Sequence, residues 1–173
     1  MTVPPGHAVP TAELFKDAFR AHPAGIAVIT AQGEDGPVGL TASSVSSVSA
    51  DPPVLVFSVS SASSSAAVLV QAETIVVHLL GADQLDIAKL FATRGADRFG
   101  GAVEWRALTT GEPLLVNAPW ALRSRILHRM PVGGSTILAA EVLSIEPGLH
   151  NDVAPLVYHN RAYHRLGDQS LLG

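Results

Sequence analysis

The sequence predicts a mostly β protein, an antiparallel β-barrel with a few short helices. At least six runs rich in Val, Ile and Leu are separated by turns that contain Gly, Pro or Asn. Helical stretches are too few to supply one crossover for each pair of strands, which a parallel sheet would need. The chain also lacks G-x-G-x-x-G after a strand and G-x-x-x-x-G-K-[ST], the phosphate-binding motifs of parallel α/β folds.

Length and composition favour one domain that handles small molecules. The 173 residues are 47% hydrophobic and 15% charged, which predicts a single domain, placed at residues 11–173. Residues 1–10 contain three prolines and a glycine and are predicted to form an N-terminal arm. A net charge of −4 without a basic tract argues against nucleic acid as a partner. The chain has no cysteine and no apolar run of about 18 residues, so we expect a cytoplasmic protein without thiolate chemistry or a membrane span.

The first quarter of the chain predicts one helix and two strands. Thr11 is a suitable N-cap for an amphipathic helix that packs its apolar stripe on the rest of the protein and stops at His22-Pro23. A β-branched strand follows over residues 26–31 and turn formers over 32–36. The second strand of this hairpin is expected to run through the Thr/Ser-rich segment at 39–49.

The middle of the chain predicts alternating strands and short helices. Residues 54–60 suit a strand buried on both faces, and residues 74–80 a further strand. One of Ser63 to Ser65 is expected to cap a helix that ends near Gln71. Asp83 is expected to cap a second helix, whose apolar face includes Ala88 and Phe91 and which Gly95 terminates.

The last part predicts a loop and several strands. Residues 98–101 form the loop, 104–108 a possible edge strand, and 120–127, 136–145 and 155–166 further strands. Arg123, Arg125 and Arg129 would share one face of their strand. We expect that face to be solvated, with contact to a ligand or partner as the alternative.

The Thr/Ser-rich segment at 39–49 is the most suggestive stretch for ligand binding. Its side chains are small, so backbone N–H groups could approach a flat polar molecule closely, and its hydroxyl groups both donate and accept hydrogen bonds. The alternative is an ordinary Ser/Thr-rich surface strand. Pattern alone favours that alternative.

The chain resembles the flavin reductase-like family of FMN-binding split barrels from about residue 12 to 166. The resemblance rests on motifs in a fixed order: Phe15 to Phe19, Pro23 to Thr30, Gly39 to Ser49, Asp51-Pro52-Pro53, Phe91-Ala92, Asp97-Arg98-Phe99, Gly111 to Leu115 and Pro155 to Tyr158. It implies a Greek-key-like antiparallel split barrel that forms a homodimer with flavin at the subunit interface. It also implies an NAD(P)H-dependent flavin reductase, which supplies reduced FMN or FAD to a partner monooxygenase.

The resemblance also implies a set of flavin-binding residues. The isoalloxazine ring would lie along Thr41, Ala42, Ser43 and Ser44. No Lys or Arg occurs between Ala21 and Ala88, so Ser58, Ser63, Ser64 and a helix N-terminus would hold the flavin phosphate. Arg98 is the expected cationic contact, with Phe99 beside it, whereas Arg94 is interpreted as a charge at a helix C-terminus.

The nicotinamide motif of the family is altered in this chain. Where such reductases usually carry Gly-Asp-His, the chain reads Gly133-Gly134-Ser135, so Ser135 is the remaining polar candidate for nicotinamide binding. Two functions stay open: a reductase that uses NADH or NADPH, and a flavin-binding module or carrier with weak or no nicotinamide-dependent activity.

The sequence suggests no other chemistry. Its seven histidines lack H-E-x-x-H spacing, so no metal site is predicted. No catalytic acid or base is assigned either, because hydride transfer between cofactors requires positioning rather than proton transfer by the protein. The choice of FMN or FAD, and whether flavin is a substrate or a bound cofactor, stays open.

Overall fold

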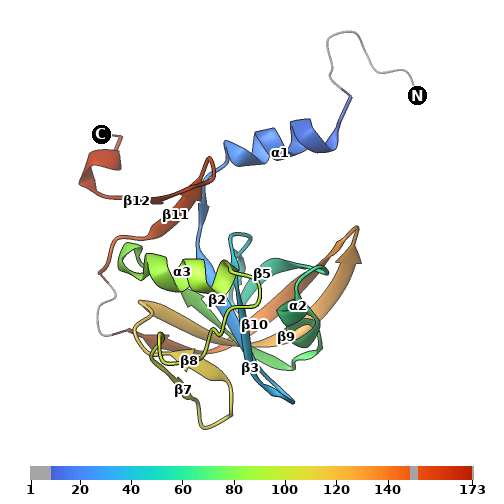
Figure 1. Ribbon diagram of the computed structural model, residues 1–173, viewed down its shortest axis with the longest axis vertical. Coiled ribbons are helices and arrows are strands. Elements are labelled where there is room, and N and C mark those ends of the chain that lie inside the picture. Colours follow the sequence, from blue (N-terminus) through green and yellow to red (C-terminus); the bar gives the residue numbers. More distant parts are fainter. Residues whose placement is uncertain (1–8, 149–151, 173) are drawn as a thin grey trace.

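The computed structural model describes residues 9–148 and 152–172, in which most elements are strands (Figure 1). Seven strands form one sheet in the order β3-β2-β6-β9-β10-β5-β4, and every named strand pair is antiparallel. The predicted mostly β, antiparallel fold is confirmed. The strands are β1 Ala24–Gly25, β2 Ala27–Gly33, β3 Gly36–Ala42, β4 Ser46–Ala50, β5 Pro53–Ser60, β6 Thr74–Leu79, β7 Trp105–Ala107, β8 Pro113–Leu115, β9 Trp120–Val132, β10 Ser135–Pro147, β11 Leu156–His159 and β12 Ala162–Arg165.

The main core lies inside the curved seven-stranded sheet. Ile29, Phe57, Leu69, Ile75 and Leu138 are fully or almost fully buried there, contributed by four strands and one helix. Strand periodicity predicted this core, since alternate side chains of each strand point to the same face. The predicted arm over residues 1–10 lies almost wholly outside the described residues, and the single-domain division stays a prediction.

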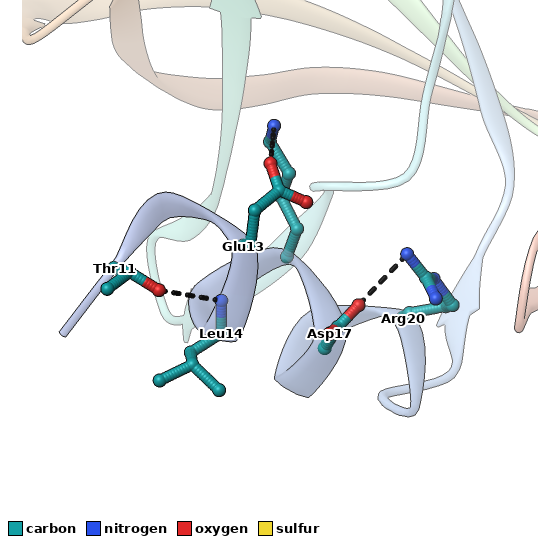
Figure 2. A network of polar contacts seen from close by, with 6 residues as sticks. Thr11, Glu13, Leu14, Asp17 and Arg20 are labelled. Carbon is teal, nitrogen blue, oxygen red and sulfur yellow. Dashed lines mark hydrogen bonds and ion pairs between the residues drawn. The ribbon is translucent and has the colours of Figure 1, made fainter. Parts of the chain in front are cut away.

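Helix α1 (Ala12–Arg20) begins where the sequence predicts but does not pack as expected. Thr11 caps it, with its Oγ1 accepting a hydrogen bond from the backbone N–H of Leu14 at 3.2 Å (Figure 2). Yet the helix buries no residue and extends away from the sheet (Figure 1). Phe15 and Phe19 stack on each other with ring centroids 4.6 Å apart, and both stay about 60% exposed. The predicted packing is therefore wrong within one chain.

The Thr/Ser-rich segment is not one continuous strand. Strand β3 ends at Ala42, an irregular stretch follows over 43–45, and β4 then pairs with β5. Strand β5 also differs from the expectation of burial on both faces: Leu55, Phe57 and Val59 are buried, whereas the side chains between them are half-buried. Its alternation shows that only one of its faces lies against the core.

Two short helices lie beside β3. Helix α2 (Ser64–Gln71) has Ser63 as its N-cap, as predicted, and α3 (Leu85–Ala92) buries Ala88 and Phe91. The predicted cap of α3 is wrong, because Asp83 lies inside a 3-10 turn, η1 (Ala82–Gln84), and Gln84 occupies the N-cap position. A Cβ on Gly39 would lie 2.7 Å from Phe91, so glycine at this position lets α3 approach β3 closely.

Two buried side chains and one half-buried side chain of the sheet hold the segment Thr110–Leu115, which contains β8 and was not predicted as a strand. Thr30 on β2 donates a hydrogen bond to the carbonyl of Pro113 at 2.6 Å. The ring of His78 on β6 accepts one from the N–H of Leu115 at 3.0 Å. Arg123 on β9 forms an ion pair with Glu112 at 2.8 Å, and Glu112 is 2% exposed.

The three arginines of β9 all have protein partners, yet Arg125 and Arg129 stay exposed to solvent. The expected solvated face is thus confirmed for these two, whereas Arg123 is half-buried against Glu112. Besides the Arg123 ion pair, Arg125 contacts Glu141 at 2.6 Å, and Arg129 donates to the carbonyls at the end of α2. Strand β9 buries Ala121, Ser124 and Ile126, so its alternation of buried and exposed side chains is interrupted near its start. Register shifts between β9 and β10 accompany this change.

The C-terminal segment forms a hairpin rather than one strand over 155–166. Strands β11 and β12 meet at Asn160 and Arg161, which have φ angles of 50° and 62°, and β11 also pairs with β1. Among the residues described, no helix has the length and apolar character needed to cross a bilayer.

His78 makes the folded chain sensitive to acid. Burial lowers the pKa of this side chain to about 4, although its hydrogen bond with the carbonyl of Val28 acts in the opposite direction. Below the unfolded pKa of 6.5, the unfolded chain binds a proton that the folded chain does not bind. The stability that neutral His78 gives is therefore complete above pH 6.5 and is lost as the pH falls toward 4.

We predict that the free energy of unfolding of the wild type falls by about 3 kcal/mol between pH 6.5 and pH 4 through this group. His78→Gln should be less stable at pH 7 but should show a weaker dependence on pH across that interval. Urea unfolding at several pH values measures this. His128→Gln, at an exposed site on β9, is the matched control and should keep the wild-type dependence. An unchanged pH dependence in His78→Gln would contradict the assignment.

Candidate flavin site

A cavity of about 360 Å³ lies between β3, the segment that joins β5 to α2, and the end of α3. We call it the serine cavity. Five residues of the predicted site line it, namely Thr41, Ser58, Ser63, Ser64 and Arg98, together with Leu40, Val59, Ser60, Ala62, Phe91, Ala92 and Arg94. These residues come from four separate parts of the chain, and the sheet register and the position of α3 bring them together.

The N-terminus of α2 would favour a negatively charged ligand in the serine cavity. Ser63 occupies the N-cap position, but its side chain makes no capping hydrogen bond. Unpaired N–H groups and the helix dipole at such an end attract negative charge. Within residues 9–148 and 152–172, no protein partner is found for the hydroxyl groups of Ser58, Ser63 and Ser64. A bound phosphate could therefore accept hydrogen bonds from all three.

Two arginines flank this helix end. Arg94 donates from Nη2 to the carbonyl of Ala62 at 2.9 Å. Arg98 donates from Nη1 to Ser65 Oγ at 3.0 Å and from Nη2 to the carbonyl of Thr93 at 2.8 Å. The Nε of Arg98 is buried and has no hydrogen-bond partner in the described chain. Both guanidinium groups are thus fixed beside the cavity with positive charge in excess.

Arg94 lies in the wall of the serine cavity, whose lining also includes Ser63 and Ser64. The sequence pattern had indicated only a charge at a helix end. The absence of any cation between Ala21 and Ala88 was an available signal, since an anion site in this half of the chain must take its charge from residues 89–98.

Of the predicted isoalloxazine run, Thr41 lines the serine cavity, whereas Ala42, Ser43 and Ser44 do not. Two hydroxyls of this run already have partners. Thr41 Oγ1 donates to the carbonyl of Ala88 at 2.6 Å, which fastens β3 to α3. Ser44 Oγ bonds with both the N–H and the carbonyl of Ser58. Ala42 is buried and Ser43 is exposed. The backbone of this run and Ser43 are the polar groups it has left to offer a ligand.

Phe99 lies on the other side of Arg98, in the wall of a second cavity of about 580 Å³. This cavity, which we call the loop cavity, is bounded by residues 95–100, by Pro37 to Gly39 on β3 and by Trp105. The ring of Phe99 packs edge-to-face on Phe91 and on Trp105, with centroid distances of 5.4 Å and 5.2 Å. Ser64 and Arg98 line both cavities.

Ser135 lies beside the serine cavity but does not line it. It opens β10 and pairs with Ser60 of β5. The preceding carbonyl of Gly134 accepts a hydrogen bond from the N–H of Ser61 at 3.0 Å. The altered nicotinamide motif therefore neighbours the loop that enters α2. Across the described ranges, no group of three or more side chains suited to a metal ion is present.

Comparison with known proteins agrees with this geometry. The model of the flavin reductase like domain matches residues 19–167, which include every lining residue of both cavities. The chain belongs to the flavin reductase-like family. The predicted resemblance is thus confirmed across most of the chain.

Individual relatives are similar over most of their length. An NADH:FMN oxidoreductase from Rhodococcus qingshengii is 40% identical over 153 residues, which are 87% of this chain and 80% of that protein. A flavin reductase domain protein from Arthrobacter sp. FB24 superposes with a TM-score of 0.86 at 33% identity, covering 94% of this chain and 99% of that one. The styrene monooxygenase flavin reductase from Pseudomonas putida S12 superposes with a TM-score of 0.78 at 26% identity, covering 88% and 97%. The split-barrel fold of flavin reductases is therefore the fold of this chain.

Proposed function

We propose that this member of the flavin reductase-like family is an NAD(P)H-dependent flavin reductase that supplies reduced FMN or FAD. The serine cavity carries the proposal: it combines a helix N-terminus, unpaired hydroxyls and two fixed guanidinium groups next to a strand of small residues. That combination suits a phosphorylated ligand with a flat polar ring. The name of the Rhodococcus relative supports NADH and FMN as the substrates.

Different site residues would contact different parts of the flavin. Ser58, Ser63, Ser64 and Arg98, together with Arg94, would hold the flavin phosphate at the start of α2. Thr41, Ala42, Ser43 and Ser44 would lie along the isoalloxazine ring, which their small side chains let approach the backbone. Phe99 would support Arg98 from the other side. A flavin held there would supply the hydride-accepting chemistry, in which NAD(P)H, a proton and oxidised flavin would give NAD(P)⁺ and reduced flavin. The protein's task is to hold the two rings together.

Two exposed apolar features support a homodimer, and the family resemblance implies that the flavin site lies at its interface. The apolar face of α1, with Leu14, Phe15 and Phe19, is exposed in one chain, as is Met130 on β9. A second copy of the chain would cover such surfaces. Light scattering at micromolar concentration with flavin present tests this.

The name of the styrene monooxygenase reductase supports a partner monooxygenase as the consumer of reduced flavin. We also expect a cytoplasmic location.

The decisive experiment follows NADH and NADPH oxidation by the purified protein with FMN or FAD added. A reductase oxidises the nicotinamide only when flavin is present. The second candidate, a flavin-binding module or carrier, would bind flavin in calorimetry while neither nicotinamide reduces it. Its supporting observation is the Gly133-Gly134-Ser135 turn beside the site, which lacks the acidic and imidazole side chains usual in the family.

We predict that Gly134→Asp combined with Ser135→His raises nicotinamide-dependent turnover. Restored positioning would bring the hydride donor within transfer distance more often, and such proximity effects reach roughly a thousandfold in rate. Flavin affinity should stay nearly unchanged, because Ser135 does not line the serine cavity. Steady-state kinetics measures the first effect and calorimetry the second. If the wild type turns over briskly and the double variant gains nothing, Ser135 does not belong to the nicotinamide site.

A further inference from the structure

Strand β3 holds helix α3 at two points. Gly39 and Thr41 are two residues apart on the strand and so share one of its faces. Ala88 and Phe91 are three residues apart on α3 and share one side of the helix. A Cβ on Gly39 would lie 2.7 Å from the ring of Phe91. Beside this contact, Thr41 Oγ1 donates a hydrogen bond to the carbonyl of Ala88 at 2.6 Å.

The hydroxyl of Thr41 fixes the position of α3 along the strand. In residues 9–148 and 152–172, no other hydrogen bond joins β3 to α3. The packing of a ring on a glycine sets how closely two elements approach, whereas a hydrogen bond depends on both distance and angle and so also fixes their offset. Without this hydroxyl, α3 would keep its contact with β3 but lose its fixed offset.

The end of α3 in turn holds the two arginines of the serine cavity. Thr93 is the C-cap residue of α3, and its N–H donates to the carbonyl of Lys89 at 3.1 Å. The carbonyl of Thr93 accepts a hydrogen bond from Arg98 Nη2 at 2.8 Å, while Arg98 Nη1 donates to Ser65 in the first turn of α2. Arg94 directly follows the C-cap. The last turn of α3 therefore sets where both guanidinium groups lie relative to the start of α2.

We propose that Thr41 is a positioning residue for the flavin phosphate: its hydroxyl holds α3 on β3, and α3 holds Arg98 and Arg94 beside the start of α2. The proposal rests on the proposed function and changes one part of it. The family resemblance implies a contact between Thr41 and the isoalloxazine ring. The hydroxyl has a single proton, which it donates to Ala88, so it has none to donate to the ring. The backbone of Thr41 can still lie along the ring.

Thr41→Val tests the proposal, because it removes the hydroxyl and keeps the branched shape of the side chain. It should weaken FMN binding about tenfold, since small displacements of positioning groups have effects of this order or larger. Riboflavin, which lacks the phosphate, should bind within about twofold of its wild-type affinity. Thr41→Ser keeps the hydroxyl and should stay within about threefold of the wild type for FMN. Calorimetric titration measures all of these affinities. Equal weakening of FMN and riboflavin, or no weakening of FMN, would overturn the proposal.

Thr30→Val is the matched control. Thr30 lies on the neighbouring strand β2, also donates to a carbonyl at 2.6 Å, and lines neither cavity. The same substitution there should lower stability but leave the ratio of FMN affinity to riboflavin affinity at its wild-type value. This ratio therefore separates positioning of the phosphate site from general destabilisation. A fall of the ratio in Thr30→Val as large as that in Thr41→Val would refute the assignment.

Two further measurements test whether Thr41 acts through α3. In an Arg98→Ala background, Thr41→Val should weaken FMN binding by less than about threefold, because residues that act through one another are not additive. A full tenfold loss in both backgrounds would contradict the proposal. Hydrogen exchange without flavin should be faster over residues 93–98 in Thr41→Val than in Thr30→Val. If the wild type binds no flavin at all, the proposed function fails, and exchange still decides the role of Thr41: equal rates in the two variants would rule it out.

Discussion

Arg123→Ala is expected to lower the free energy of unfolding by about 3 to 5 kcal/mol, the usual cost of removing one partner of a buried ion pair. Arg123 contacts Glu112 through both Nε and Nη2, at 2.9 Å and 2.8 Å. Burial by itself would raise the pKa of Glu112. The hydrogen bonds from Arg123, Thr110 and Thr74 outweigh burial and lower that pKa to about 2. Without Arg123, the fold must bury a poorly compensated carboxylate or protonate it.

Urea unfolding at pH 7 measures the change, and the sheet supplies a matched control. Arg125, two residues along β9, pairs with Glu141 at 2.6 Å, but its side chain is 56% exposed. Arg125→Ala should cost less than about 1 kcal/mol, as exposed ion pairs do. The double variant Glu112→Gln, Arg123→Met should be more stable than Arg123→Ala, because it leaves no buried charge. Equal losses for Arg123→Ala and Arg125→Ala would contradict the buried-pair interpretation.

Arg98→Ala is expected to weaken FMN binding about 30- to 150-fold, equivalent to about 2 to 3 kcal/mol, because a charge-assisted contact to phosphate is lost. Arg98 stands at the wall shared by the two cavities, and its buried Nε has no partner within the described chain. Riboflavin, which lacks the phosphate, should bind the variant and the wild type with nearly equal affinity. The FMN affinity of Arg98→Lys should lie between those of Arg98→Ala and the wild type, since lysine keeps the charge but loses the planar fork of donors.

Calorimetric titration with FMN and with riboflavin makes this comparison. Arg106→Ala is the control, because Arg106 is an exposed arginine on β7 that does not line either cavity. It should leave both affinities unchanged. If Arg98→Ala weakened riboflavin as much as FMN, Arg98 would support the loop at 95–100 rather than bind the phosphate.

Local sequence patterns predicted the starts of two helices but not the position of Arg94. Helix starts near Thr11 and Ser63 followed from side-chain chemistry confined to a few residues, and the structure has both N-caps at those positions. By contrast, the pattern around Arg94 favoured an isolated charge at a helix end. Its place in the serine cavity depends on a contact with Ala62, 32 residues away in the sequence. Patterns that span a few residues cannot predict a contact between residues so far apart.

The irregular part of the sheet at residues 43–45 could not be predicted from the sequence pattern either. A continuous strand through 39–49 is consistent with the β-propensity of its residues, yet the chain breaks at 43–45, where Ser44 bonds with Ser58 instead of extending the ladder. For α1, the sequence pattern correctly predicted the apolar stripe. Within one chain, however, no surface covers that stripe.

The sequence by itself determined the antiparallel β class, most of the strands and the family, because alternation, turn residues and motif order are local properties that survive without knowledge of the fold. The tertiary structure alone decided which polar groups meet. Thr30 and Pro113 are 83 residues apart, and Arg98 and Ser65 are 33 apart. Such contacts depend on strand register, on the register shifts between β9 and β10, and on the close approach of α3 at Gly39. Since a shift of one residue in register turns every side chain to the other face, cavities and buried ion pairs are properties of the assembled sheet.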